Sequence, residues 1–268
     1  MIQYNMSRAH IEEAGRAGAH IVEETDSTRR VTVLNDFDLF VLKDDISLAP
    51  HLTNDGFWEA WIASWLTRWL RPGMTFIDIG ANCGFYTMLA DKLVGKYGNV
   101  ISYEPNPVYA ELLRATRNVN DSTFKIREMA LSDSAGKATL TVPDNYHGSA
   151  SIMTDFKGFD TKKTYDVTQG TLDSELLNLT FFRHDIIKMD AEGAEEAIWN
   201  GGSRIWDAND HTTVMLEYTP NSYSDGFVDQ LFEWGDVSAI DHSGGEFKVN
   251  KEWIGSLTDW WMLVVRKR

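Results

Sequence analysis

The sequence predicts an α/β fold built on a doubly wound, mostly parallel sheet. Residues 76–79 form an apolar strand, a turn that contains Gly80 and Gly84 follows, and a helical pattern then resumes at once. A second β-prone segment, residues 100–103, ends in Glu104. Strand-like and helix-like segments continue to alternate towards the C-terminus, which is the pattern of βαβ units.

Composition and charge limit the class of protein. The chain has 268 residues, 43% of them hydrophobic, which is enough for one large α/β domain or two small ones. A net charge of −15 argues against binding to nucleic acid or to an anionic membrane, because both would repel the protein. A single cysteine excludes an intramolecular disulfide, and the chain shows no signal-peptide pattern and no apolar run of about 20 residues. These features predict a soluble cytoplasmic protein.

The N-terminal part carries no recognisable chemistry. Residues 1–30 are polar and predict a short helix or an irregular lead, and residues 31–42 predict a β-hairpin. We expect residues 1–56 to form an extension that packs as one unit with a domain at residues 57–268.

The domain begins with a tryptophan-rich helix. Residues 57–70 carry apolar side chains at helical spacing, among them Trp58, Trp61, Trp65 and Trp69. A row of tryptophans could stack on sugars, but the spacing favours a helix that packs against the sheet.

The later elements extend the α/β pattern. Residues 124–130 predict the third strand, and residues 138–142 predict a further strand that no helix precedes. The polar stretch 143–170 is long for a connection, which predicts a functional loop or lid. The remaining predicted elements are helix 172–179, strand 185–190, helix 194–200, strand 213–218, helix 227–234, and strands 237–241, 246–249 and 260–266.

Polar residues stand at the ends of the predicted parallel strands. Because the carboxyl ends of such strands meet at one edge of a doubly wound sheet, we expect these residues to share a site. They are Asp78, Glu104, Met129 and Ala130, Asp190 with Glu192, and Glu217.

The glycine turn indicates the kind of ligand. Gly80 and Gly84 do not form the Gly-x-Gly-x-x-Gly pattern of a pyrophosphate site, and no Walker lysine follows them. The turn therefore favours a nucleoside without phosphates. Glu104 can accept both hydroxyls of a ribose, and its alternative role is to cap the helix that starts near Val108.

Further motifs occur along the sequence in a recognisable order. They are Arg71-Pro72-Gly73, Glu104-Pro105-Asn106-Pro107, Ala130-Leu131-Ser132-Asp133, Gly148-Ser149-Ala150-Ser151, Thr171-Leu172-Asp173, Lys188-Met189-Asp190-Ala191-Glu192-Gly193-Ala194-Glu195, Met215-Leu216-Glu217-Tyr218 and residues 261–267. With these motifs, roughly residues 57–267 resemble the S-adenosylmethionine-dependent methyltransferases, and more narrowly the FkbM type. The resemblance implies a Rossmann-like, seven-stranded sheet with S-adenosylmethionine as cofactor.

The resemblance also implies roles around the cofactor. Asp190 would reach the ammonium group of the donor, and Phe85 and Tyr86 would wall the methyl-transfer channel, although Phe85 fits core packing equally well. Glu104 would hold the ribose, within a loop that contains Pro105 and Asn106. The other cofactor-binding residues would be Asp78, Gly80, Asn82 and Gly84 around the methionine portion, and Met129 and Ala130 beside the adenine.

Transfer of a methyl group to an alcohol requires a base near the acceptor. Glu192 is the first candidate for this base or for an acceptor anchor. Lys188 would neutralise the neighbouring acids or form a structural ion pair, and Glu217 would contact the acceptor or Lys188. His147, in the polar loop, is a rival base. Two further rivals are His184 and His211. A divalent cation would suit Asp190, Glu192 and Glu217, but no ligand spacing demands one, and we predict no metal.

The predicted function is O-methylation of a hydroxyl group on a sugar, a glycan or a polyketide-like small molecule. The expected partner is this acceptor, without nucleic acid or membrane, and the oligomeric state is open. Two alternatives remain: an NAD-dependent oxidoreductase on a related βαβ fold, and a non-catalytic binding module that retains the fold.

Overall fold

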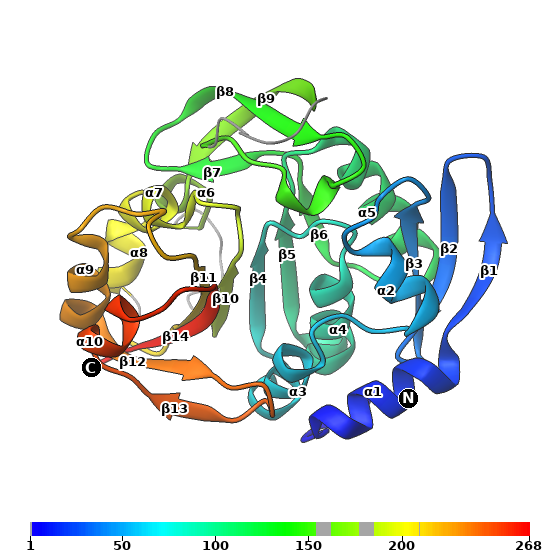
Figure 1. Ribbon diagram of the computed structural model, residues 1–268, viewed down its shortest axis with the longest axis horizontal. Helices are drawn as coiled ribbons and strands as arrows, with labels where there is room; N and C mark the ends of the chain where they lie inside the picture. Colours follow the sequence, from blue (N-terminus) through cyan, green and yellow to red (C-terminus); the bar gives the residue numbers. More distant parts are fainter. Residues whose placement is uncertain (1, 154–161, 177–184, 209) are drawn as a thin grey trace.

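A computed structural model describes residues 2–153, 162–176, 185–208 and 210–268. Its centre is a sheet in which eight strands are described, in the order β13-β12-β14-β11-β10-β4-β5-β6 (Figure 1). Their bounds are β13 Glu246–Lys248, β12 Gly235–Ile240, β14 Trp261–Lys267, β11 Thr213–Tyr218, β10 Ile186–Met189, β4 Thr75–Ile79, β5 Asn99–Tyr103 and β6 Lys125–Arg127.

The sheet is mostly parallel, as predicted. The strands from β11 to β6 are parallel neighbours, and β14 lies antiparallel between β11 and β12. The short strand β13 pairs with β12 and adds an eighth strand to the predicted seven. The order places β4 and β10 side by side, so that their carboxyl ends adjoin at one edge of the sheet.

Helices cover both faces of the sheet, which confirms the doubly wound architecture (Figure 1). Neighbouring residues of one strand point to opposite faces: Phe76 packs into the core beside helices α3 to α5, and Ile77 packs into the core beside α6 to α10. The first group comprises α3 Ala60–Trp69, α4 Phe85–Val94 and α5 Pro107–Val119. The second comprises α6 Leu172–Leu176, α7 Glu195–Asn200, α8 Ser203–Ala208, α9 Phe227–Trp234 and α10 Lys251–Gly255. No helix in the described ranges is long and apolar enough to cross a membrane.

The N-terminal extension is a helix and a small antiparallel sheet. Helix α1 Arg8–Gly18 precedes strands β1 His20–Glu24, β2 Thr28–Val33 and β3 Phe37–Leu42, and α2 Ala49–Asn54 follows. The predicted hairpin is confirmed as β2 and β3, whereas β1 was missed because every one of its residues is exposed and gives no alternating apolar pattern. The buried side chains of β2 and β3 belong to the same core as those of α4.

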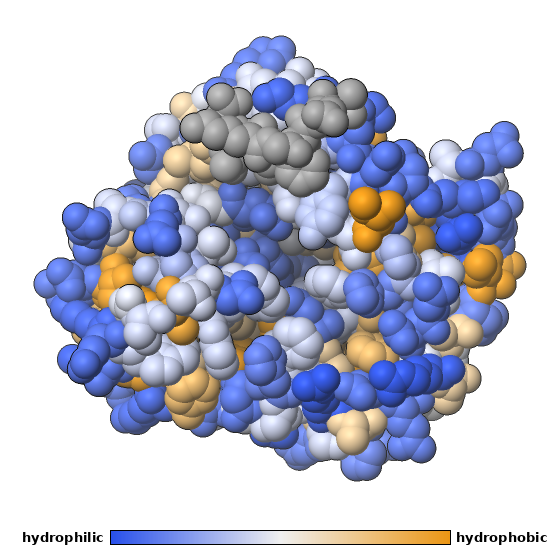
Figure 2. All heavy atoms as spheres, viewed as in Figure 1, coloured by the Kyte–Doolittle hydropathy of each residue, from blue (hydrophilic) through white to orange (hydrophobic). Residues whose placement is uncertain are grey.

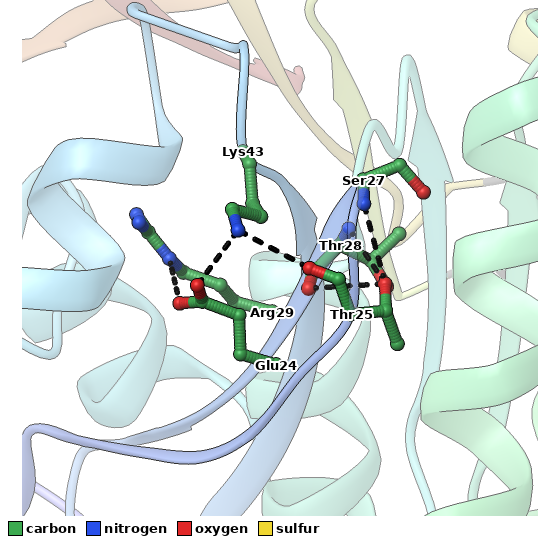
Figure 3. A network of polar contacts seen from close by, with 6 residues as sticks. All are labelled: Glu24, Thr25, Ser27, Thr28, Arg29 and Lys43. Carbon is green, nitrogen blue, oxygen red and sulfur yellow. Dashed lines mark hydrogen bonds and ion pairs between the residues drawn. The ribbon is translucent and has the colours of Figure 1, made fainter.

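Polar contacts close the tip of this extension (Figure 3). The carboxylate of Glu24 accepts hydrogen bonds from Arg29 at 2.8 Å and from Lys43 at 2.7 Å. The hydroxyl groups of Thr25 and Thr28 lie 2.8 Å apart. Because Lys43 directly follows β3, these contacts tie the end of β1 to the rest of the small sheet.

Two predicted elements differ from the structure. The third strand does not run through residues 124–130: β6 ends at Arg127, and Ala130 begins a separate strand, β7 Ala130–Ser132. The stretch 143–170 is not a single loop, because β9 Lys162–Thr171 pairs with β7 and with β8 Gly136–Pro143. The error has a physical cause: β9 is largely polar, only two of its ten residues are buried, and its pairing partners are distant in sequence.

The described residues 144–153, which follow β8, retain loop character. They contain the short 3-10 helix η2, His147–Ser149. Residues 154–161, and the predicted continuation of α6 to residue 179, lie outside the described residues.

Candidate active site

A cavity of about 740 Å³ opens at the carboxyl ends of β4, β5, β10 and β11. Figure 2 shows this side of the molecule, which is hollowed near its centre. Most of the predicted site residues line the cavity: Gly80, Asn82, Phe85, Tyr86, Glu104, Pro105, Met129, Ala130, His147, Lys188, Asp190, Glu192 and Glu217. The described lining does not include Asp78, Gly84 or Asn106, which lie behind it.

The glycine turn after β4 holds three strand ends together. Gly80 has φ of 77°, and a Cβ atom there would lie 1.7 Å from the carbonyl oxygen of Asp190. The N–H group of Gly80 donates to the carbonyl of Tyr103, at the end of β5. The neighbouring Asn82 has φ of 51°. Only glycine allows this approach of backbone to backbone, which explains the residue type at position 80.

Glu104 is buried in the wall of the cavity. One carboxylate oxygen accepts from the N–H of Asn82 at 2.7 Å and the other from the N–H of Asn106 at 2.8 Å. Burial raises the pKa of Glu104 to about 7, although these two N–H groups favour the charged form. The side chain of Asn106, by contrast, caps helix α5 by accepting from the N–H of Val108. The cap is therefore Asn106, and Glu104, which lines the cavity, has further lone pairs with which it can accept hydrogen bonds.

Lys188 sits between two carboxylates at the base of the site. Its ammonium nitrogen lies 3.4 Å from Asp78 and 3.2 Å from Asp190. Burial alone would lower the pKa of Lys188, but Asp190 and Asp78 raise it well above its ordinary value. Asp78 also accepts from the hydroxyl of Thr87 at 2.6 Å. Of the two roles open to Lys188, the geometry shows the ion pair.

Three acidic side chains converge beyond β10 and β11. Asp190, Glu192 and Glu217 each offer a carboxylate oxygen, and these oxygens lie within 4.8 Å of one another. Burial and the charge of Asp190 raise the pKa of Glu192 to about 8 and that of Glu217 to about 10. Such a cluster can accept a proton, bind several hydroxyl groups or hold a cation.

The second glutamate of the Asp-Ala-Glu-Gly-Ala-Glu motif has a structural task. The carboxylate of Glu195 is fully buried and accepts from the N–H groups of Ala191 and Gly193, at 2.6 and 3.0 Å. The hydroxyl of Tyr223 donates to it at 2.9 Å. These bonds fix the loop that carries Glu192, whose φ is 52°.

The candidate histidines occupy different places. His147 is buried and lines the cavity, with its Nε2 atom 3.8 Å from the carboxylate of Asp44. His211 is exposed and does not belong to the described lining. His184 lies outside the described residues.

Sequence reasoning missed part of the wall. Trp65 is buried in the core, as predicted for the whole tryptophan row, but Trp58 and Trp61 line the cavity. Trp260 joins them, with its ring stacked on Trp61 at a centroid distance of 6.4 Å. Glu59 also lines the cavity. A charged residue inside the apolar run 57–62 was the signal that could have identified it.

Comparison with known protein families identifies the family of this chain. The profile of the methyltransferase FkbM domain matches residues 78–241, more than half of the chain. The chain belongs to the FkbM methyltransferase family. This membership confirms the predicted family and disfavours the predicted NAD-dependent alternative. Several residues between Ile46 and Trp61, and Trp260, contribute to the cavity wall but lie outside the matched segment.

Individual relatives are distant from this FkbM methyltransferase. A Protein-L-isoaspartate O-methyltransferase of Methanothrix thermoacetophila is 34% identical over 64 residues, which cover 24% of this chain and 30% of that protein. A solved FkbM methyltransferase of Methylobacillus flagellatus is 13% identical, with a TM-score of 0.44 over 72% of this chain and 43% of that one. A SAM-dependent O-methyltransferase of Thermotoga maritima has the same identity and TM-score, over 90% and 78%. The chain thus spans less than half the length of the first two.

Proposed function

We propose that this protein transfers a methyl group from S-adenosylmethionine to a hydroxyl group of a sugar, a glycan or a polyketide-like small molecule. One observation carries the proposal. A single cavity joins the glycine turn and Glu104, which suit a nucleoside, to the cluster of Asp190, Glu192 and Glu217, which suits a polar acceptor.

The donor side of the cavity fits an adenosine with a charged tail. The absence of a side chain at Gly80 lets a ligand approach the backbone, and Glu104 can accept from ribose hydroxyls. Met129 and Ala130 line the part of the wall that we assign to adenine. S-adenosylmethionine supplies a methyl group activated by a sulfonium, and the acidic lining suits this positive charge.

The acceptor side provides a base. We assign to Glu192 the role of the base that takes the proton from the acceptor hydroxyl, because burial and the charge of Asp190 raise its pKa to about 8 and make its deprotonated form a stronger base than an ordinary glutamate. Glu217, with its pKa raised to about 10, carries a proton at neutral pH and can donate to a second acceptor oxygen. A dry, aligned site supplies much of the rate of such a displacement.

The aromatic wall favours a sugar among these acceptors. Trp58, Trp61 and Trp260 present flat apolar faces to the same cavity as the carboxylates. Sugar rings offer C–H groups to such faces and hydroxyl groups to carboxylates. We also retain two further proposals. The net charge of −15 supports the exclusion of nucleic acid, and the single cysteine supports a cytoplasmic location.

The test starts with calorimetric titration of S-adenosylmethionine and S-adenosylhomocysteine, with NAD as the control. We expect micromolar binding of the first two and none of NAD. Donor carrying a labelled methyl group is then incubated with mono- and oligosaccharides and with macrolide-type alcohols. Label in an alkali-stable ether supports O-methylation. Donor binding without transfer to any acceptor would favour the non-catalytic binding module.

A further inference from the structure

Glu59 occupies an unusual position in the cavity wall. It precedes α3 as the N-cap residue, with φ of 35° and ψ of 63°, a left-handed conformation that is costly for a residue with a long side chain. It contributes no side-chain hydrogen bond to the cap of this helix. Strained residues of this kind concentrate at functional sites, because the surrounding structure must hold them in place. The position lies before the segment matched by the family profile.

The side chain of Glu59 is held by a contact with helix α4. The hydroxyl of Tyr86, in the first turn of α4, donates to one carboxylate oxygen at 2.5 Å. Tyr86 is itself fixed, because the ammonium group of Lys188 lies 5.1 Å from the centre of its ring. The contacts therefore direct Glu59 towards the base of the cavity, where the glycine turn and Asp190 meet.

The cavity wall around Glu59 is rich in carboxyl groups. The described lining contains the carboxylates of Glu59, Glu104, Asp190, Glu192 and Glu217, and Lys188 is its only lysine or arginine. Lys188 is already engaged by Asp78 and Asp190. Burial, and then the charge of Asp190, raise the pKa of Glu59 to about 7, so a cation between Glu59 and Asp190 would stabilise both charged forms.

We propose that Glu59, together with Asp190, binds the ammonium group on the amino-acid portion of the methyl donor. An alkylammonium group has three N–H donors, and Asp190 already shares its charge with Lys188. Glu59 supplies the additional carboxylate from the opposite, N-terminal side of the cavity. The proposal rests on the donor half of the proposed function and is independent of the acceptor. It assigns to the region before the family-matched segment a direct part in donor binding.

The test compares two ligands that differ in one group. Binding of S-adenosylhomocysteine and of its deaminated analogue, in which hydrogen replaces the amino group, is measured by calorimetry for the wild type and for Glu59→Gln. We expect Glu59→Gln to reduce the affinity for S-adenosylhomocysteine about tenfold to a hundredfold, which is the loss typical of a hydrogen bond to a charged group. The affinity for the deaminated analogue should change less than about twofold, within ordinary mutational scatter.

Controls separate this role from a structural one. Glu111→Gln removes an exposed carboxylate from α5 and should leave both affinities unchanged. If Glu59→Gln does not fold, Glu59→Asp, which withdraws the carboxylate by one methylene group, must show the same selective loss. An equal loss of affinity for both ligands, or an unchanged affinity for S-adenosylhomocysteine, overturns the proposal. Failure of the wild type to bind either ligand would instead overturn the donor assignment itself.

Discussion

The ammonium nitrogen of Lys188 lies 3.4 Å from a carboxylate oxygen of Asp78, and both side chains are completely buried. The two residues are direct partners in the register of β10 and β4. Their pairing places Lys188 in the cavity wall and Asp78 outside the described lining. Asp190, which lines the cavity, shares the same ammonium group. The ion pair therefore helps to position a carboxylate that lines the cavity.

We predict that Lys188→Met destabilises the fold by about 3–5 kcal/mol, because Asp78 would remain buried without a countercharge. The double variant with Asp78→Asn should recover a large part of this loss, since the uncompensated charge is removed. Urea unfolding of the wild type, both single variants and the double variant measures the coupling. Strictly additive losses in these four proteins would show that the two groups do not interact.

Gly80 offers a second test of how the site is built. In Gly80→Ala the new methyl group would collide with the carbonyl oxygen of Asp190, 1.7 Å away, so the ends of β4 and β10 must separate. We expect a loss of stability of about 3 kcal/mol or more, with loss of S-adenosylhomocysteine binding. The matched control is Gly73→Ala, where φ is 84° but nothing lies within 4 Å of the added atom. This variant should lose only about 1 kcal/mol and retain binding. Similar behaviour of both variants would exclude the collision as the cause.

The raised pKa values of the cavity acids predict how stability depends on pH. A carboxyl group whose pKa rises on folding holds its proton more tightly in the folded state than in the unfolded chain. For Glu192 and Glu217 the folded pKa values are about 8 and about 10, against an ordinary 4.5. The stability that these two groups contribute is complete below pH 4.5 and is lost as the pH rises through their pKa values in the folded state. The free energy of unfolding of the ligand-free protein should therefore decrease from pH 5 towards pH 9.

Glu217→Gln isolates this effect. Removing one group whose pKa rises on folding removes its share of the proton release on unfolding, so stability should decrease less steeply with pH than in the wild type. Urea unfolding at intervals of one pH unit measures the slope, with the exposed Glu111→Gln as the control. An unchanged slope in Glu217→Gln would mean that this group does not titrate differently in the folded state.

The donor assignment gives a sharper binding prediction. Glu104→Ala should abolish measurable binding of S-adenosylhomocysteine, because it removes the ribose acceptor and also frees the N–H groups of Asn82 and Asn106. Thermal unfolding would verify that the variant is folded. Glu128→Ala, which removes a half-exposed carboxylate paired with Arg114, is the control and should bind normally. Undiminished binding by Glu104→Ala would remove Glu104 from the donor site.

Local motifs explain why so much of the site was predictable. Gly80, Glu104 and Asp190 directly follow a strand, and Glu217 lies near the carboxyl end of β11. All four line the cavity because parallel strands bring their carboxyl ends together. The roles of residues that do not line the cavity were harder to predict. Asp78 belongs to β4, and its side chain points at Lys188 rather than into the cavity, a distinction that depends on the register with β10.

Features that depend on distant contacts were missed. The exposed, polar strand β9 gives no apolar alternation, and its existence depends on pairing with β7 and β8. Glu59 was missed because helical periodicity describes the faces of α3 and says nothing about what the N-cap residue before it meets. The strained backbone at this residue and its bond to Tyr86 appear only when α4 is packed beside it.

The tryptophans provide the last prediction, which concerns the acceptor. Trp61 lines the cavity and stacks on Trp260, whereas Trp69 of the same helix is 44% exposed and is absent from the described lining. With a sugar acceptor identified in the screen, Trp61→Ala should raise KM for the acceptor about tenfold, the loss expected for one stacking face, and leave the Kd of S-adenosylhomocysteine within about twofold. Trp69→Ala should change neither constant. A loss of donor affinity in Trp61→Ala as large as the loss for the acceptor would show that this tryptophan supports the whole cavity and does not select the sugar.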